Sequence, residues 1–273
     1  MTKALQIRAM AVAPRAMRGR WTDPLLRYLL LLAILAALVA MAVDLDLAPS
    51  RLLAGVDKLG RFAVAMFPPS DGGDLVRILR SLAETFAMAI AGTVLAVVAA
   101  APLGLIGAKT VMPNKVLHFA FRRFLDVFRG VPVLVWALIL VTAFGLGPFG
   151  GVIALALADI PTLAKLFAEA IENVEEGPVE GVRSAGLPPM AAIRYGLAPQ
   201  VAPVWASQSL FFLEGNFRNA AVLGLVGAGG IGFELEERIR IFAFDEVAFI
   251  VLLFMVSVAV LDTLSRELRK KLA

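Results

Sequence analysis

The stretch Glu180-Gly181-Val182-Arg183-Ser184-Ala185-Gly186 is a polar island between two long apolar runs of the chain. Pro178 can occupy the first turn of a helix, where its missing N–H costs nothing, and Gly186 can supply the left-handed residue that ends that helix. Pro188 and Pro189 then interrupt the chain and can open a second short helix. The stretch therefore predicts a helix, a break and a helix, with a surface to which a partner can dock.

The composition places this island in a membrane protein. Hydrophobic residues make up 60% of the 273 residues, and the mean hydropathy is +0.84. A soluble domain of this length cannot cover so much apolar surface with polar side chains, so lipid must solvate much of it. The absence of cysteine excludes disulfides and thiolate metal ligands, and the single histidine, His118, argues against a histidine-based metal site or catalytic triad. We therefore expect no metal site and no catalytic residues.

Six apolar runs approach the length of a membrane-spanning helix, about 20 residues. The first, at 25–43, follows a basic tail and lacks the cleavage site of a signal peptide, so we expect it to be retained. Residues 44–80 are predicted to lie outside the membrane and to include an amphipathic helix. The remaining spans are expected at 84–108, 131–146, 151–171, 201–226 and 247–264.

Lysine and arginine cluster in the N-terminal tail, at 109–129 and at the C-terminal end. With an even number of spans these segments share one side of the membrane, and the positive-inside rule predicts that both termini are cytoplasmic. The near-neutral segment 44–80 weakens this signal without reversing it. We assign the net charge of +4 to contact with anionic lipid, because no basic face is interleaved with the aromatic residues that nucleic-acid binding requires.

The spacing of the polar island resembles the EAA loop of permease subunits of ATP-binding-cassette (ABC) importers. In that loop Glu-Ala-Ala, three residues and a Gly are followed by twelve residues and a Pro. Glu180, Gly186 and Pro199 match, whereas Gly181 and Val182 replace the alanines and Gly196 stands where an apolar residue is common. Glu-Gly-Val-Arg-x-x-Gly followed by Tyr-Gly-x-x-Pro-Gln is similar to the phosphonate-type, PhnE-like branch. The resemblance implies a coupling helix that fits a groove on a cytoplasmic ATPase, formed around Glu180, Gly181, Val182, Arg183, Gly186 and Pro199.

Two glycine motifs suggest nucleotide binding but fail on context. Residues 227–232 satisfy G-x-G-x-x-G, yet a membrane span precedes them and no parallel-sheet pattern surrounds them. Residues 104–110 fail the phosphate-loop spacing, because Ala108 separates the glycine from Lys109. We therefore expect no nucleotide site and no cofactor in this chain. The resemblance instead implies a tight external loop after the penultimate span, built on Gly227, Gly229, Gly230 and Gly232.

Polar residues crowd the predicted fifth span. A charge at membrane depth costs about 2.5–3.5 kcal/mol, so these residues must face protein or water. Glu214 and Arg218 are four positions apart and are expected to pair on one helix face. Two interpretations stay open: a structural ion pair, or a path for an anion that includes Arg218 with Asn216 or Asn219. The stretch at 212–218 resembles phosphonate-type permeases, and the other candidates in the intramembrane polar network are Glu84 and Asp159.

The resemblance implies an all-α, polytopic helical bundle with a MetI-like permease core and an extra N-terminal helix. The predicted divisions are a cytoplasmic tail at 1–24, a first transmembrane helix at 25–43, an external segment at 44–80, the core at 81–265 with a coupling loop at about 172–199, and a basic cytoplasmic tail at 266–273.

The function implied is that of a non-enzymatic permease subunit of an ABC importer in the bacterial plasma (inner) membrane. It transports phosphonate or a related phosphorus oxyanion, such as phosphite or phosphate. Expected partners are a second copy of the permease, two ATPase subunits that hold ATP and Mg²⁺, and an extracytoplasmic substrate-binding protein. The alternative is a sibling importer for methionine or another amino acid. A membrane oxidoreductase that uses the glycine motif is the more distant alternative.

Overall fold

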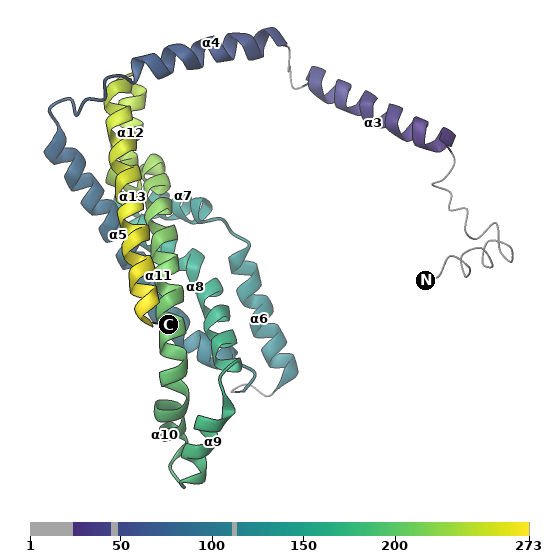
Figure 1. Ribbon diagram of the computed structural model, residues 1–273, viewed down its shortest axis with the longest axis vertical. Coiled ribbons are helices and arrows are strands. Elements are labelled where there is room, and N and C mark those ends of the chain that lie inside the picture. The colour runs from purple at the N-terminus through teal and green to yellow at the C-terminus, as the bar shows by residue number, and fades with distance from the viewer. Residues whose placement is uncertain (1–23, 45–48, 111–113, 273) are drawn as a thin grey trace. The chain divides into compact units, whose positions relative to one another are not determined.

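The computed structural model describes residues 24–44, 49–110 and 114–272, and most of these lie in helices (Figure 1). The chain divides into two units, residues 1–64 and 65–273, which are described separately. The N-terminal tail predicted at 1–24 lies outside the described residues apart from Pro24.

The first unit contains α3 (Pro24–Asp44) and nearly all of α4 (Pro49–Ala65). α3 covers the first predicted span, and large apolar side chains such as Leu31 and Leu35 are exposed on it. A helix that is apolar on all sides requires lipid or protein around it. α4 lies in the segment for which an amphipathic helix is predicted, and its polar side carries an ion pair between Arg61 and Asp57, four positions apart.

The second unit is a helical bundle. Its elements, in chain order, are α5 (Leu75–Gly107), α6 (Lys115–Arg129), α7 (Val133–Phe144), α8 (Pro148–Glu172), α9 (Glu176–Ser184), α10 (Pro189–Ala191), the π-helix η2 (Ala192–Leu197), α11 (Ala198–Leu223), the π-helix η3 (Gly224–Ala228), α12 (Gly230–Arg240) and α13 (Phe244–Leu272). The α9–α10 hairpin lies at one end of this unit and α12 at the other (Figure 1).

The centre of the bundle is the packing of α5 against α8. A Cβ atom at Gly104 would lie 2.7 Å from Cβ of Phe167, and one at Gly92 would lie 2.8 Å from Cβ of Leu155. Small residues therefore let the two helices approach closely, as in other membrane helix pairs. α11 packs against both helices, and α13 packs along α11.

Local sequence explains the break between α6 and α7. Asn114 caps the start of α6 by accepting hydrogen bonds from the N–H groups of Val116 and Leu117. Gly130 ends that helix, and Pro132 lies immediately before α7, where its missing N–H is tolerated. The two helices meet at a bend of 74°.

Among the described residues, four helices are long and apolar enough to cross a membrane: the part of α3 from Arg27 to Asp44, α5, α8 and α13. α6 and α7 form a fifth candidate if the bent pair is one span. Six spans were predicted, and the difference is α11, which covers most of the predicted span 201–226 and ends at Leu223. α11 has 26 residues, but it is not among the candidate spans because glutamine, serine, asparagine and charged residues interrupt its apolar stretches.

Candidate functional site

A helical hairpin connects α8 to α11 and carries the predicted coupling residues. Gly186 follows α9 with a φ of +73°, a left-handed conformation that favours glycine. After the break, α10 and η2 return the chain and run directly into α11. The helix, break and helix expected from the sequence are therefore present, but the second helix is continuous with α11 rather than separate.

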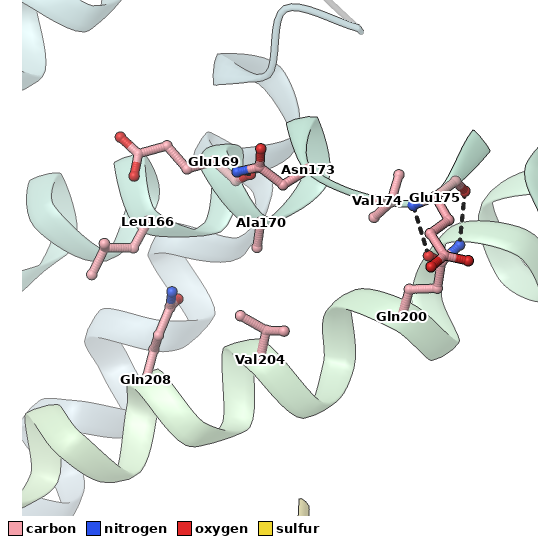
Figure 2. A pocket seen from close by; sticks show the side chains of 9 residues that line it. All are labelled: Leu166, Glu169, Ala170, Asn173, Val174, Glu175, Gln200, Val204 and Gln208. Carbon is pink, nitrogen blue, oxygen red and sulfur yellow. Dashed lines mark hydrogen bonds between the residues drawn. The ribbon is translucent and has the colours of Figure 1, made fainter. Parts of the chain in front are cut away.

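Two sets of contacts hold the hairpin closed. Gly196 of η2 is buried against α9, because a Cβ atom there would lie 2.8 Å from Cα of Val179 and 3.2 Å from the carbonyl oxygen of Pro178. Gln200 accepts a hydrogen bond from the N–H of Glu175 (3.0 Å) and donates to the carbonyl of Glu175 (3.2 Å; Figure 2). It also donates to the carbonyl of Gly196 (2.8 Å). These bonds satisfy backbone groups at the helix ends and join the hairpin to α11.

The outer surface of the hairpin carries charged side chains. Glu180, Arg183 and Pro199 are exposed, and Val182 is half-buried. A Cβ atom at Gly181 or Gly186 would have no neighbour within 4 Å. An acidic and a basic side chain thus lie on a constrained backbone that the other described residues of the second unit leave uncovered.

A buried amide joins three helices inside the bundle. Asn216, only 1% exposed, donates from Nδ2 to Oγ1 of Thr93 (2.9 Å) and to Oδ2 of Asp159 (2.6 Å). These bonds link α11 to α5 and α8. The sequence identified Asn216 and Asp159 as candidates; it did not identify Thr93, because a single threonine among small residues carries no distinctive signal.

The predicted pair between Glu214 and Arg218 is wrong. Oε1 of Glu214 lies 2.7 Å from Nη2 of Arg269, and Nη1 of Arg218 lies 3.3 Å from Oδ1 of Asp262. Both partners belong to α13, which packs along α11 and supplies the opposite charge to each residue. Asn219, the neighbour of Arg218, is half-buried.

The glycine motif forms a tight turn between α11 and α12. Gly227, Gly229 and Gly230 have φ values of +93°, +83° and +69°. A Cβ atom at Gly232 would lie 1.8 Å from the carbonyl oxygen of Ala221, so the two helices meet backbone to backbone. No strand occurs in the part of the chain that the structure describes, so the strand–turn–helix setting of a dinucleotide site is missing around this motif.

Glu84 belongs to this turn rather than to the polar group around Asn216. Its Oε1 would lie 2.9 Å from a Cβ atom at Gly229, and the adjacent Thr85 accepts a hydrogen bond from the N–H of Ile231 at 2.8 Å. Thr93 is nine positions further along α5, which is about 14 Å at 1.5 Å per residue. The predicted intramembrane candidates are therefore divided among separate locations.

Sequence reasoning missed a buried ion cluster at the glycine-turn end of the bundle. Arg238, 3% exposed, forms ion pairs with Glu234, with Glu246 at 2.8 Å and with Asp74 at 3.4 Å. Glu234 also accepts a hydrogen bond from Arg77 at 2.9 Å. The cluster ties the starts of α5 and α13 to α12. The signal for it was the run of charged residues from Glu234 to Arg240, after the glycine motif, for which no element was predicted from the sequence.

Ion pairs also fasten α6 to α8. Oε1 of Glu172 accepts hydrogen bonds from Nη2 of Arg122 (2.9 Å) and from the backbone N–H of Lys109 (2.8 Å). Lys165 pairs with Asp126 one helical turn from the end of α6. Arg129, at that end, has no carboxylate within ion-pair distance among the described residues. No group of three or more histidine, aspartate or glutamate residues there is arranged to hold a metal ion.

A bundle of apolar helices with buried polar groups is the architecture of a polytopic membrane protein. Residues 100–273 match the family model described as binding-protein-dependent transport system inner membrane component, and the chain belongs to that family. The phosphite transport system permease protein PtxC of Stutzerimonas stutzeri is 40% identical over 221 residues, covering 81% of this chain and 80% of PtxC. The phosphate-import permease protein PhnE of Mycolicibacterium smegmatis is 35% identical over 234 residues, covering 86% of this chain and 44% of PhnE.

A solved structure shares the fold. A chain of the inward-facing MetNI methionine ABC transporter matches with a TM-score of 0.64 at 19% identity, over 73% of this chain and 98% of that chain. The predicted all-α, MetI-like permease fold is thereby confirmed, and so is the assignment to an inner membrane transport component.

Proposed function

We propose that this chain is the transmembrane subunit of an ATP-driven importer for phosphite, phosphonate or phosphate. The observation that carries the proposal is the pattern of relatives. Proteins named for phosphite, phosphonate or phosphate transport are 35–47% identical to the chain, whereas those named for D-methionine transport are 27–33% identical. The importer for methionine or another amino acid is therefore the weaker alternative.

In the proposed importer, two copies of this chain form the translocation path and two separate ATPase subunits bind ATP and Mg²⁺. The chain itself holds no cofactor, and an extracytoplasmic binding protein delivers the anion. Both termini and the hairpin face the cytoplasm. The exposed Glu180 and Arg183 support docking of an ATPase on the hairpin, because charged side chains on a constrained backbone can fit a groove of opposite charge. Closure of the ATPases then moves the hairpins and, through rigid helices, the walls of the path.

The test is ATP-dependent uptake into proteoliposomes that contain this chain, its genomically neighbouring ATPase and the binding protein. Labelled phosphite, phosphate, phosphonate and methionine are offered separately. Uptake of a phosphorus oxyanion without uptake of methionine is expected, and uptake of methionine alone would refute the substrate assignment. Glu180→Lys is expected to preserve membrane insertion and to uncouple ATP hydrolysis from uptake, and unchanged coupled transport in that variant would refute the docking role.

A further inference from the structure

We propose that Arg129 and Arg269, with Thr162, Ser207 and Gln208, form a transient binding site for a tetrahedral oxyanion between α8 and α11. The residues line an open cavity of about 520 Å³ whose other walls are apolar. They come from four helices: α6, α8, α11 and α13. The inference rests on the proposed function and identifies where the path holds its anion.

The charge of this cavity favours an anion. Two guanidinium groups line it, and its lining contains no carboxylate. Arg269 shares its charge with Glu214 at 2.7 Å, but Arg129 has no carboxylate within ion-pair distance among the described residues. Arg218, in contrast, is paired with Asp262 on α13 and is not part of the lining. Arg129 interacts only at longer range with Asp126, three positions earlier on α6, so the less compensated of the two positive charges lies at Arg129, outside the span that the sequence indicated.

The neutral polar groups suit an oxyanion that retains a proton. The hydroxyls of Thr162 and Ser207 can donate hydrogen bonds to oxygen atoms, and arginine can donate two parallel bonds to the same anion. The amide oxygen of Gln208 is buried and has no hydrogen-bond partner among the described residues. It can accept a hydrogen bond from the P–OH group of a hydrogen phosphate or hydrogen phosphite. A fully deprotonated anion would leave that oxygen unsatisfied.

This cavity adjoins a second pocket nearer the hairpin, and the side chains that line the second pocket carry negative charge. Leu166 and Gln208 also line the adjoining pocket, where Glu169 and Glu175 supply carboxylates and Gln200 lies near the hairpin (Figure 2). An anion that moves from the arginines toward the hairpin passes from positive to negative surroundings. The carboxylates lower its affinity at that end, which favours release over retention.

The test exploits a chain without cysteine. Ser207→Cys places a single thiol in the cavity of the full chain, assembled with its ATPase in phosphatidylcholine nanodiscs. The rates of reaction with an anionic and with a neutral methanethiosulfonate reagent are measured, and their ratio reports the local charge. Adding Arg129→Gln is expected to lower that ratio about ten-fold, because the removed unit charge no longer attracts the anionic reagent across the cavity. Arg123→Gln is the matched control, because Arg123 lies on α6 but outside the cavity lining.

Inorganic phosphate is expected to slow labelling of the Ser207→Cys chain, and the Arg129→Gln variant is expected to lose this protection. Equal rate ratios in the Arg129→Gln and Arg123→Gln variants would overturn the proposal, even if the wild-type system imports a phosphorus oxyanion. Protection by phosphatidylglycerol in the nanodisc without protection by phosphate would also overturn it, because the site would then hold a lipid head group. Failure of the wild-type system to import any phosphorus oxyanion would instead refute the proposed function.

Discussion

Gly196→Ala is expected to open the hairpin and to uncouple transport from ATP hydrolysis. The added Cβ atom would lie 2.8 Å from Cα of Val179, whereas ordinary contact begins at 3.4 Å, so α9 and η2 must separate by about 0.6 Å. Val179 presents backbone at this contact, and backbone cannot rotate away as a flexible side chain does. Forcing such a contact costs about 1–3 kcal/mol.

A helical alanine is more favourable than a glycine by about 1 kcal/mol, which opposes this cost without cancelling its upper range. The net effect on the free energy of unfolding is therefore small, and the main effect is the displacement of α9 from η2. A shift of this size at the hairpin displaces the exposed Glu180 and Arg183 relative to a docked ATPase. We expect normal assembly with the ATPase and a lower ratio of substrate imported to ATP hydrolysed.

The assay measures uptake and ATP hydrolysis in the same proteoliposomes. Gly177→Ala is the matched control, because it adds the same methyl group to α9 at a position with nothing within 4 Å. It is expected to keep the wild-type ratio. If Gly196→Ala and Gly177→Ala gave the same ratio, close packing at Gly196 could not be what positions the hairpin.

Three further predictions concern stability in detergent, measured by thermal unfolding of the purified chain. Arg238→Met should destabilise the fold by about 1–3 kcal/mol, because the buried Glu234 loses one of its two guanidinium partners and keeps only the half-exposed Arg77; a melting temperature near that of the wild type would contradict the assigned ion cluster. Asn216→Leu should cost about 1–3 kcal/mol by removing the donor to Thr93 and Asp159, and an unchanged melting temperature would show that the three helices do not depend on it. Gly232→Ala should prevent folding, since its Cβ atom would lie 1.8 Å from the Ala221 carbonyl oxygen, whereas Gly215→Ala, with nothing within 4 Å, should be tolerated; equal stability of the two would refute the backbone contact.

The hairpin was predictable because its determinants are local. Pro178 and Pro189 restrict the backbone at their own positions, and Gly186 permits the left-handed conformation that ends the helix, whatever surrounds them. The contact that holds the hairpin closed was not predictable in the same way. Gly196 departs from the usual apolar residue of the motif, and only the approach of Val179, 17 positions earlier in the chain, gives that departure a physical reason.

The predicted pairing of the intramembrane charges was wrong because it depends on contacts between helices that are distant in the sequence. Spacing along one helix can indicate that Glu214 and Arg218 share a face, but it cannot show which other helix lies against that face. Asp262 is 44 positions from Arg218, and the packing of α13 decides the outcome. α12 was missed because a glycine motif marks a turn clearly and says nothing about the charged helix that begins inside it.

The hairpin connects α8 to α11, and the oxyanion cavity lies between the same two helices. The contacts between these helices therefore decide how a movement of the hairpin reaches the translocation path. α8 and α11 are joined in the bundle interior by the hydrogen bond from Asn216 to Asp159, and α8 is held closely to α5 at Gly104. Nearer the hairpin, the two helices border an open pocket on one side. On the other side they pack together, with Ile171 against Val201 and the ring of Phe167 stacked on Trp205 at 4.4 Å. On the proposed mechanism, a force at the hairpin therefore separates α8 and α11 on the side that borders the oxyanion cavity, and the packed side holds them together. Such a separation moves Thr162 away from Ser207 and Gln208, which would weaken the oxyanion site at the moment when its exit opens.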